Sequence, residues 1–282
     1  MTRYARMFDR LERAGEGALG AFVMLGDPDL ETSGLILDAL VDGGADMVEL
    51  GIPFSDPIAD GPVIQAAAER ALHRGVTPAD CFGLLRRFRE RQPDVPVGLL
   101  TYANIVLARG VDAFYGAAAG AGVDSVLVAD VPSLEAGPFI RAARAAGVAP
   151  VLIAAPNTPE STLRRIAGQS EGYTYCVARA GVTGAHAEPG KGLSDMIGAL
   201  RRFGAPAPIL GFGISRADQV RSGLEAGAAG IISGSAIVSL IAANPGREGE
   251  AVRAFVSELK AATRPATGRG TDPISGRRSA CR

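Results

Sequence analysis

The chain alternates short apolar runs with longer amphipathic stretches. Eight of the apolar runs have the length expected of β-strands, and most segments between them are long enough for a helix. Continuous apolar strands separated by helices are typical of a parallel sheet that is buried on both faces. The predicted strands are Leu19–Leu25, Met47–Leu50, Val97–Thr101, Ser125–Ala129, Val151–Ala154, Tyr173–Val177, Pro208–Gly211 and Gly230–Ser233.

A glycine-containing pattern recurs ahead of several of these runs. DGGADMVEL, GAGVDSVLV, AAGVAPVLI and EAGAAGIIS each place small residues and a glycine shortly before an apolar stretch. A glycine can adopt a positive φ just past a helix end, and a short loop then leads to the next strand. Repeated βα units favour a single closed (β/α)8 TIM barrel over an open sheet, although periodicity alone does not establish closure.

The two ends of the chain differ from its middle. Tyr4, Met7, Phe8 and Leu11 share one face of a predicted extra N-terminal helix, which could cover the bottom of a barrel. From Thr263 onward the chain is rich in Arg, Gly, Ser, Thr and Pro, which predicts disorder, with a basic contact arm as the alternative. We therefore expect a barrel domain over residues 1–262 and a basic tail over residues 263–282.

Composition narrows the classes of function. Hydrophobic residues make up 47% of the chain, so it can bury a sizeable core, and the net charge of −1 does not favour nucleic acid or an acidic membrane as a partner. The three cysteines form no C-x-x-C pair, which favours a reducing cytoplasm. There are only two histidines, so a metal site is not expected. The charged N-terminus lacks the apolar core of a signal peptide.

Glu49 and Asp60 are the candidate acid and base groups. Glu49 lies near the end of the second predicted strand, where the reacting groups of a barrel enzyme are found. If its carboxyl group points into the barrel mouth, desolvation would raise its pKa; the alternative is a solvated carboxylate. Asp60 ends a proline-stiffened loop just before Pro62, and by itself it could merely cap the following helix.

Glycine-rich turns follow the last three predicted strands. Gly211–Ser215 and Gly234–Ile237 stand after the seventh and eighth strands, where backbone N–H groups commonly bind phosphate in this fold. Simple turn chemistry is the alternative for each. Arg179–Gly184 follows the sixth strand and leads into Ala185–Lys191, a polar stretch that could form a lid.

Other reactive residue types are weaker candidates. His73 falls on a polar helix face and is expected to be solvated, whereas His186 lies in the possible lid and could contact a ligand. Cys176 belongs to an apolar strand, where packing is the simpler interpretation than nucleophilic catalysis. Carboxylates are therefore the preferred acid and base groups.

The segment from Glu49 to Pro62, ELGIPFSDPIADGP, closely resembles the signature of the tryptophan synthase alpha subunit family. The resemblance extends through Val128–Pro132, Arg179–Gly184, Gly211–Ser215 and Ser233–Val238, and covers the chain to about Ala262. It implies a lyase that cleaves indole-3-glycerol phosphate to indole and glyceraldehyde 3-phosphate in tryptophan biosynthesis. It also implies an α2β2 complex in which the Asp56 loop faces the beta subunit and indole passes to that subunit through a tunnel.

The resemblance also implies a role for each site residue. Glu49 would be the principal acid and base, and Asp60 would bind the indole N–H. Thr183 would belong to a loop that closes over the substrate and meets Asp60. The remaining assignments are phosphate binding by Gly184, Gly213, Gly234 and Ser235, and enclosure of the indole ring by Phe22, Leu100, Tyr175 and Phe212.

These roles suit a retro-aldol cleavage, which requires no metal or organic cofactor. The indole ring must gain a proton at C3, and the hydroxyl beside the breaking bond must lose one, so one carboxyl group can serve both transfers. Lys191 and Lys260 are the only lysines, and neither stands at a strand end, which disfavours a Schiff-base aldolase.

Two alternatives stay open from the sequence. Another phosphate-binding barrel enzyme, such as a sugar-phosphate isomerase or an indole-3-glycerol phosphate synthase, would keep the glycine turns. It would not call for paired Glu49 and Asp60, and a synthase of that type would be expected to use a strand-end lysine. A catalytically silent barrel that only regulates a partner would have no reason to keep both carboxylates.

Overall fold

The computed structural model describes residues 1–178, 192–211 and 213–264. In these residues parallel strands and helices alternate along the chain. The strands are β1 (Ala18–Met24), β2 (Met47–Gly51), β3 (Val97–Thr101), β4 (Ser125–Val128), β5 (Ala149–Pro150), β6 (Ile153–Ala154), β7 (Thr174–Val177), β8 (Pro208–Gly211) and β9 (Gly230–Ser233).

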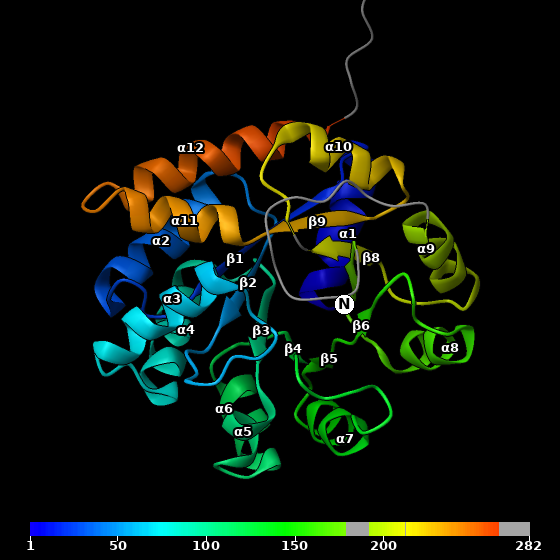
Figure 1. Ribbon diagram of the computed structural model, residues 1–282, viewed down its shortest axis with the longest axis horizontal. Coiled ribbons are helices and arrows are strands. Elements are labelled where there is room, and N and C mark those ends of the chain that lie inside the picture. The colour runs from blue at the N-terminus through cyan, green and yellow to red at the C-terminus, as the bar shows by residue number, and fades with distance from the viewer. Residues whose placement is uncertain (179–191, 212, 265–282) are drawn as a thin grey trace, which may run out of the picture.

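Helices surround the strands on the outside of the sheet (Figure 1). Every strand except β5 is followed by one or two helices, as the βα repeat predicts. The helices are α1 (Arg3–Ala14), α2 (Leu30–Asp42), α3 (Pro62–His73), α4 (Pro78–Arg91), α5 (Ala103–Leu107), α6 (Val111–Gly120), α7 (Gly137–Ala145), α8 (Glu160–Gln169), α9 (Gly192–Arg202), α10 (Ala217–Glu225), α11 (Ser235–Ala243) and α12 (Glu248–Ala261).

The sheet closes through a divided fifth strand. Its order is β5-β4-β3-β2-β1-β9-β8-β7-β6, and only two residues separate β5 from β6 along the chain. The Val151 N–H donates to the Val126 carbonyl at 3.0 Å on one side, and the Leu152 carbonyl accepts from the Tyr175 N–H at 3.1 Å on the other. The eight-stranded barrel prediction is therefore confirmed, with its fifth strand changing partner midway.

The prediction of one continuous strand over Val151–Ala154 is wrong. Pro150 has no N–H, so it cannot donate to either neighbouring ladder, and the strand is interrupted just after it. β5 pairs only with β4, and β6 pairs only with β7. The fifth barrel strand is thus two short pieces.

The glycine pattern marks the turns into β2, β4, β5 and β9. Each of four turns contains a glycine in the left-handed region, where a side chain would strain the backbone. The residues are Gly44 (φ 99°), Gly122 (φ 78°), Gly147 (φ 72°) and Gly227 (φ 102°). The interpretation of these motifs as helix-to-strand turns is confirmed.

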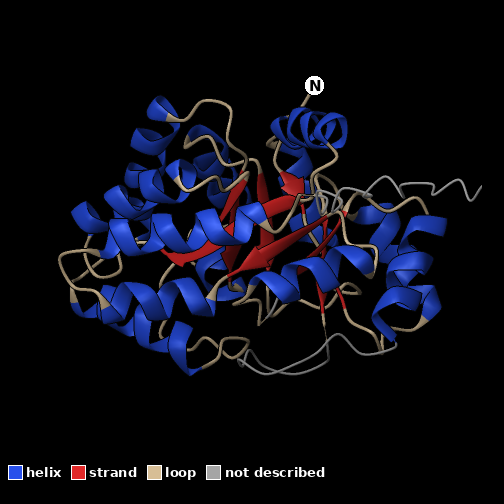
Figure 2. Ribbon diagram, turned by 90° about the horizontal axis from the view of Figure 1, so that it is seen from above, coloured by secondary structure: helices blue, strands red, loops and turns tan. Residues whose placement is uncertain are grey.

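Buried apolar side chains form two separate clusters. The larger cluster lies between the strands and the surrounding helices, and the smaller one fills the barrel interior, with Met47, Leu127 and Ile232 among its members. Helix α1 adds Tyr4 and Met7 to the interior cluster and lies across one end of the barrel (Figure 2). The prediction that the N-terminal helix covers the barrel bottom is confirmed. Within the described residues, no helix is both long and apolar enough to traverse a bilayer.

Candidate active site

Strand β2 directs Glu49 into the barrel. Side chains alternate between the two faces of a strand, and Met47 belongs to the interior cluster whereas Val48 and Leu50 belong to the outer one. Glu49 therefore points inward with Met47. It lies between Phe22 of β1 and Gly98 of β3 in the parallel register.

The Glu49 carboxyl group is almost completely buried, with 1% of the residue exposed. The Tyr173 hydroxyl donates a hydrogen bond of 2.5 Å to its Oε1 atom, while Oε2 has no hydrogen-bond partner among the described residues. Burial raises the pKa of Glu49 to about 7, and the Tyr173 hydrogen bond opposes that rise by stabilising the carboxylate. A pKa near neutrality suits a group that must both give and take a proton.

Tyr173 is held from below by α1. The rings of Tyr4 and Tyr173 lie 5.4 Å apart between centroids, and the Tyr4 hydroxyl shares a 2.8 Å hydrogen bond with Ser125 Oγ. Gly98 leaves room for this contact, since a Cβ atom there would lie 3.0 Å from Ser125 Oγ and 3.3 Å from the Tyr4 hydroxyl. The floor of the barrel therefore fixes the partner of Glu49.

Asp60 approaches from the loop after β2. The N-cap of α3 is Gly61, and no side-chain hydrogen bond caps that helix, so the capping interpretation of Asp60 is wrong. Burial raises the pKa of Asp60 to about 6, and the nearby Tyr102 hydroxyl partly opposes the rise. Tyr102 follows β3, and its ring stacks on that of Phe54 in the loop that carries Asp60, with ring centroids 5.3 Å apart.

One cavity at the C-terminal ends of the strands brings the predicted residues together. The two carboxylates lie with apolar side chains and with the glycine turns that follow β8 and β9. Its lining residues are Phe22, Glu49, Asp60, Ile64, Leu100, Tyr175, Gly213, Ile232, Gly234 and Ser235. Eight of the residues assigned from the sequence are in this set, and Ile64 and Ile232 are additions to it.

Three of the assigned residues cannot be placed. Thr183, Gly184 and Phe212 lie outside the described residues, as do His186 and the possible lid Ala185–Lys191. Their assignments remain predictions.

Two turns form the end of the cavity where phosphate binding is predicted. Gly213 has a φ of 74°, and Gly234 precedes α11 without any side-chain cap on that helix. The Ser233 hydroxyl donates to the Ile214 carbonyl at 2.6 Å, which joins the end of β9 to the turn after β8. The N–H groups at the start of α11 can therefore meet a negatively charged ligand.

The model of the family described as tryptophan synthase alpha chain matches residues 8–264. The chain belongs to this family. Cleavage of indole-3-glycerol phosphate to indole and glyceraldehyde 3-phosphate is the reaction of a tryptophan synthase alpha chain, so the activity predicted from the sequence is confirmed at the level of the family. A different phosphate-binding barrel enzyme is excluded.

Sequence and structural relatives agree with this assignment. The tryptophan synthase alpha chain of Shewanella amazonensis is 52% identical over 266 residues, which cover 93% of this chain and 100% of the relative. A solved structure of Mycobacterium tuberculosis tryptophan synthase is 29% identical with a TM-score of 0.86, covering 94% of this chain and 99% of that one. The tryptophan synthase complex from Pyrococcus furiosus is 36% identical with a TM-score of 0.79, covering 86% of this chain and 98% of that one.

The remaining candidates of this alpha chain do not enter the site. His73 is exposed at the end of α3, as expected. Burial raises the pKa of the Cys176 thiol to about 12, which favours the packing interpretation over a nucleophile. Lys260 lies at the end of α12 and pairs with Asp46 at 2.7 Å, far from any strand end that faces the cavity. In the described part of the chain, no three His, Cys, Asp or Glu side chains are grouped to hold a metal ion.

Sequence reasoning missed the tyrosines that surround the two acids. The chain has five tyrosines, and Tyr4, Tyr102, Tyr173 and Tyr175 all lie at Glu49, at Asp60 or in the floor below them. Only Tyr175 was assigned a role in the site. The available signal was the scarcity of tyrosine and its repetition at positions 173 and 175 of one predicted strand, but the contacts of these tyrosines come from distant segments.

Proposed function

We propose that Glu49 is the acid and base of the alpha reaction and that Asp60 stabilises the indole ring while it carries positive charge. The observation that supports this assignment most directly is that both buried carboxylates line one cavity together with Gly213 and Gly234. Two acids with raised pKa values and different neighbours can hold different protonation states near neutral pH.

The cavity suggests how the substrate lies. The indole ring fits against Phe22, Leu100 and Tyr175, with its N–H directed at Asp60. The phosphate then reaches the turns at Gly213 and Gly234, where backbone N–H groups and the Ser235 hydroxyl can bind it. Glu49 is left beside the bond that breaks.

The proton transfers balance at Glu49. The protonated carboxyl group donates to C3 of indole, and the resulting positive charge on the ring is stabilised by the Asp60 carboxylate. The Glu49 carboxylate then accepts the proton of the hydroxyl on the adjacent glycerol carbon. That oxygen forms the aldehyde C=O, the carbon–carbon bond breaks, and its electron pair returns to the ring. Glu49 finishes protonated, as it began.

We further propose that the barrel mouth binds a tryptophan synthase beta subunit in an α2β2 complex. The related P. furiosus protein is described as a tryptophan synthase complex. Three large apolar side chains are exposed in segments that follow β2, β3 and β4 on the face that carries the cavity: Ile58, Leu107 and Leu134. Exposed apolar groups on one face are typical of an interface, and this face would let indole pass directly to the partner.

The boundaries and location of the protein complete the proposal. Residues 1–262 act as one catalytic domain, with residues 263–282 as a separate basic tail. We place the protein in the cytoplasm, and the two buried free thiols Cys81 and Cys176 support a reducing compartment.

The deciding experiment is an indole-release assay on the purified chain. Indole-3-glycerol phosphate is supplied with and without a beta subunit, and indole is measured directly. We expect indole release by the chain alone and faster release in the complex. A chain that releases no indole in either condition would be a catalytically silent barrel, and the assignment of Glu49 and Asp60 would fail.

A further inference from the structure

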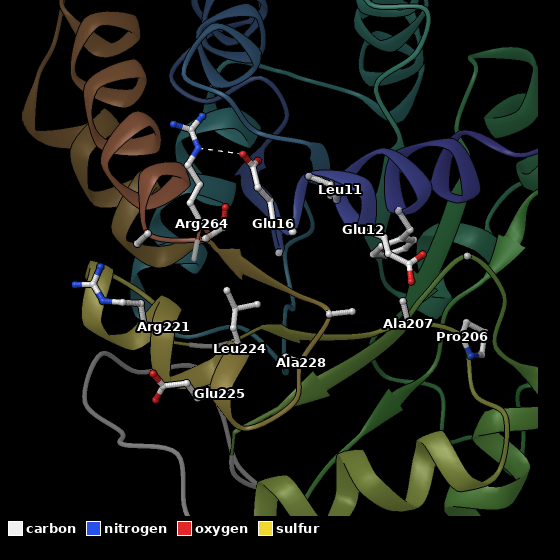
Figure 3. Close-up of a pocket in the computed structure, with 17 residues that line it drawn as sticks. Leu11, Glu12, Glu16, Pro206, Ala207, Arg221, Leu224, Glu225, Ala228 and Arg264 are labelled. Carbon is white, nitrogen blue, oxygen red and sulfur yellow. Dashed lines mark hydrogen bonds and ion pairs between the residues drawn. The ribbon is translucent and has the colours of Figure 1, made fainter. Parts of the chain in front are cut away.

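A second cavity lies at the opposite end of the barrel from Glu49. It has a volume of about 810 Å³ and lies between α1, α10 and the end of α12 (Figure 3). Pro206 and Ala207 precede β8, and Ala228 and Ala229 precede β9, whereas Gly213 and Gly234 of the active site follow those strands. We name this cavity the basal groove, and it is independent of the proposed catalytic site.

The basal groove has an apolar floor and a charged rim, on which Glu12 and Glu225 stand beside the exposed Arg221. Leu224 and Ala228 lie at its centre, with Leu11 of α1 on one wall (Figure 3). Three glutamates and two arginines are among the residues that line the groove. Glu16 is already paired with Arg264 at 3.1 Å and with Lys260 at 2.9 Å. The other charged lining residues are Glu12, Arg221 and Glu225.

Two of the rim glutamates are available to a ligand. Glu12 and Glu225 are exposed and form no ion pair with another described residue. An apolar floor between two free carboxylates suits an extended basic peptide, whose backbone lies along the floor while its cationic side chains meet the rim.

Such a peptide begins at the edge of the groove. Arg264 lines the groove and is the last described residue before positions 265–282. The match to the alpha chain family also ends at residue 264, so these 18 residues lie outside the matched region. At roughly 3.3 Å per residue they can extend about 60 Å, which is far more than is needed to cross the groove.

The composition of this segment complements the groove. It contains four arginines and one aspartate, and its only large apolar side chain is Ile274. Attachment to the same chain gives a tethered peptide an effective concentration of about 1 mM or more, so contacts too weak to hold a free peptide can still be occupied. A separate molecule would bind without this gain in effective concentration.

We propose that residues 265–282 of the chain bind in the basal groove of the same molecule. Ile274 packs on the floor formed by Leu224 and Ala228, and the arginines near it meet Glu12 and Glu225. The segment thereby covers an apolar surface on the face of the barrel that is remote from the active site.

The test uses the one cysteine in that segment. Cys81 and Cys176 are buried, so a nitroxide can be attached selectively at Cys281, and amide signals of the full chain are recorded by NMR. We expect strong broadening at residues 11–17 and 224–229, and little at residues 51–60 on the opposite end. Broadening that is absent from the groove, or spread evenly over the surface, would overturn the proposal.

Three variants and one mixture make the result specific. Glu12→Gln with Glu225→Gln should reduce the groove broadening several-fold, whereas the matched exposed pair Glu69→Gln with Glu90→Gln should not change it. Ile274→Ser should reduce it as well. In a mixture of nitroxide-labelled chain with isotope-labelled, nitroxide-free chain, groove broadening would show binding between two copies and would overturn the intramolecular proposal. Equal broadening in all variants would overturn it too.

Discussion

The Tyr173 hydroxyl donates a 2.5 Å hydrogen bond to Oε1 of Glu49 from beneath the candidate active-site cavity. The second carboxyl oxygen, Oε2, has no partner among the described residues. The barrel floor therefore holds one oxygen and leaves the other without such a contact, as the proposed proton transfers require. Because the hydrogen bond favours the carboxylate while burial favours the neutral acid, the pKa of Glu49 depends on both.

Removal of the Tyr173 hydroxyl should shift the pH dependence of the reaction. Tyr173→Phe deletes the interaction that lowers the pKa of Glu49, so that pKa rises above about 7 and the alkaline limb of kcat/KM moves to higher pH. The measurement is the pH profile of indole release. Tyr115→Phe, at another buried tyrosine in the outer cluster, is the control and should leave the limb in place. An unmoved limb in Tyr173→Phe would mean that the hydrogen bond does not act on the catalytic group.

The unmodified enzyme should have a bell-shaped profile of kcat/KM. Glu49 must be protonated at the start, so activity falls as pH rises through about 7, and Asp60 must be ionised, so activity falls as pH drops through about 6. Substrate phosphate also titrates at about 6. Asp60→Asn separates the contribution of Asp60 to the acidic limb from that of the substrate phosphate. The variant should have lower activity, and the acidic limb that it keeps should come from the phosphate alone. A profile that is flat from pH 5 to 9 would contradict the assigned protonation states.

Glu49→Gln should abolish turnover and stabilise the fold at alkaline pH. The loss of an acid and base group costs roughly 10² to 10⁴ in rate. The pKa of Glu49 is raised from 4.5 in the unfolded chain to about 7 in the folded one, so the folded chain binds more protons between those values. The free energy of unfolding therefore falls as pH rises through that window, by about 3 kcal/mol when fully expressed.

Denaturant unfolding of the Glu49→Gln variant checks the stability part of this prediction. Its free energy of unfolding should exceed that of the unmodified chain at pH 8 and be close to it at pH 4. Near-normal indole release, or equal stability differences at the two pH values, would contradict the proposed environment of Glu49.

Gly234→Asp should weaken substrate binding more than Gly234→Ala. A Cβ atom at this position would lie 3.3 Å from Phe22 Cβ, so even alanine requires a small adjustment. Aspartate adds a negative charge at the start of α11, where the phosphate is proposed to bind, and repels it. KM and the binding of inorganic phosphate are the measurements. Equal affinities in the two variants would remove Gly234 from the phosphate site.

Lys260→Met should destabilise the barrel without changing KM. The Lys260 ammonium lies 2.7 Å from Asp46 and 2.9 Å from Glu16, at the end of the barrel away from the cavity. Removing one member of a buried ion-pair group costs about 3 kcal/mol here, the lower end of the usual range, because Asp46 keeps Arg10 and Glu16 keeps Arg264. Thermal unfolding is the readout. Arg247→Ala, which removes an exposed pair with Glu250, should cost less than about 1 kcal/mol.

Local pattern was enough to predict the repeated units and the position of Glu49 near the end of a strand. The glycine turns and the alternation of side chains along β2 are properties of short segments, so Gly44 and Glu49 could be interpreted without distant contacts. The roles of Thr183, Gly184 and Phe212 stay predictions, since these residues lie outside the described part of the chain.

Contacts between distant segments could not be predicted in the same way. Tyr4 and Tyr173 meet only because α1 lies under the barrel and the strands close into a ring. The division of the fifth strand has a local cause in Pro150, but its effect on pairing depends on which strands stand on either side. Asp60 was open to a capping role until the backbone placed Gly61 at the start of α3.

The partner exchange at Val151 and Leu152 also creates a weakly paired position in the ring of strands. β5 and β6 each contribute two residue pairs to the sheet, whereas β1 and β2 share five. Opening the barrel between β5 and β6 leaves the longer ladders intact, so amide hydrogens of β5 and β6 should exchange with solvent before those of β1 and β2. A circular permutant that joins the original termini and places new ones between β5 and β6 would keep the longer ladders, such as that of β1 and β2, intact. This position is therefore the natural one for new termini.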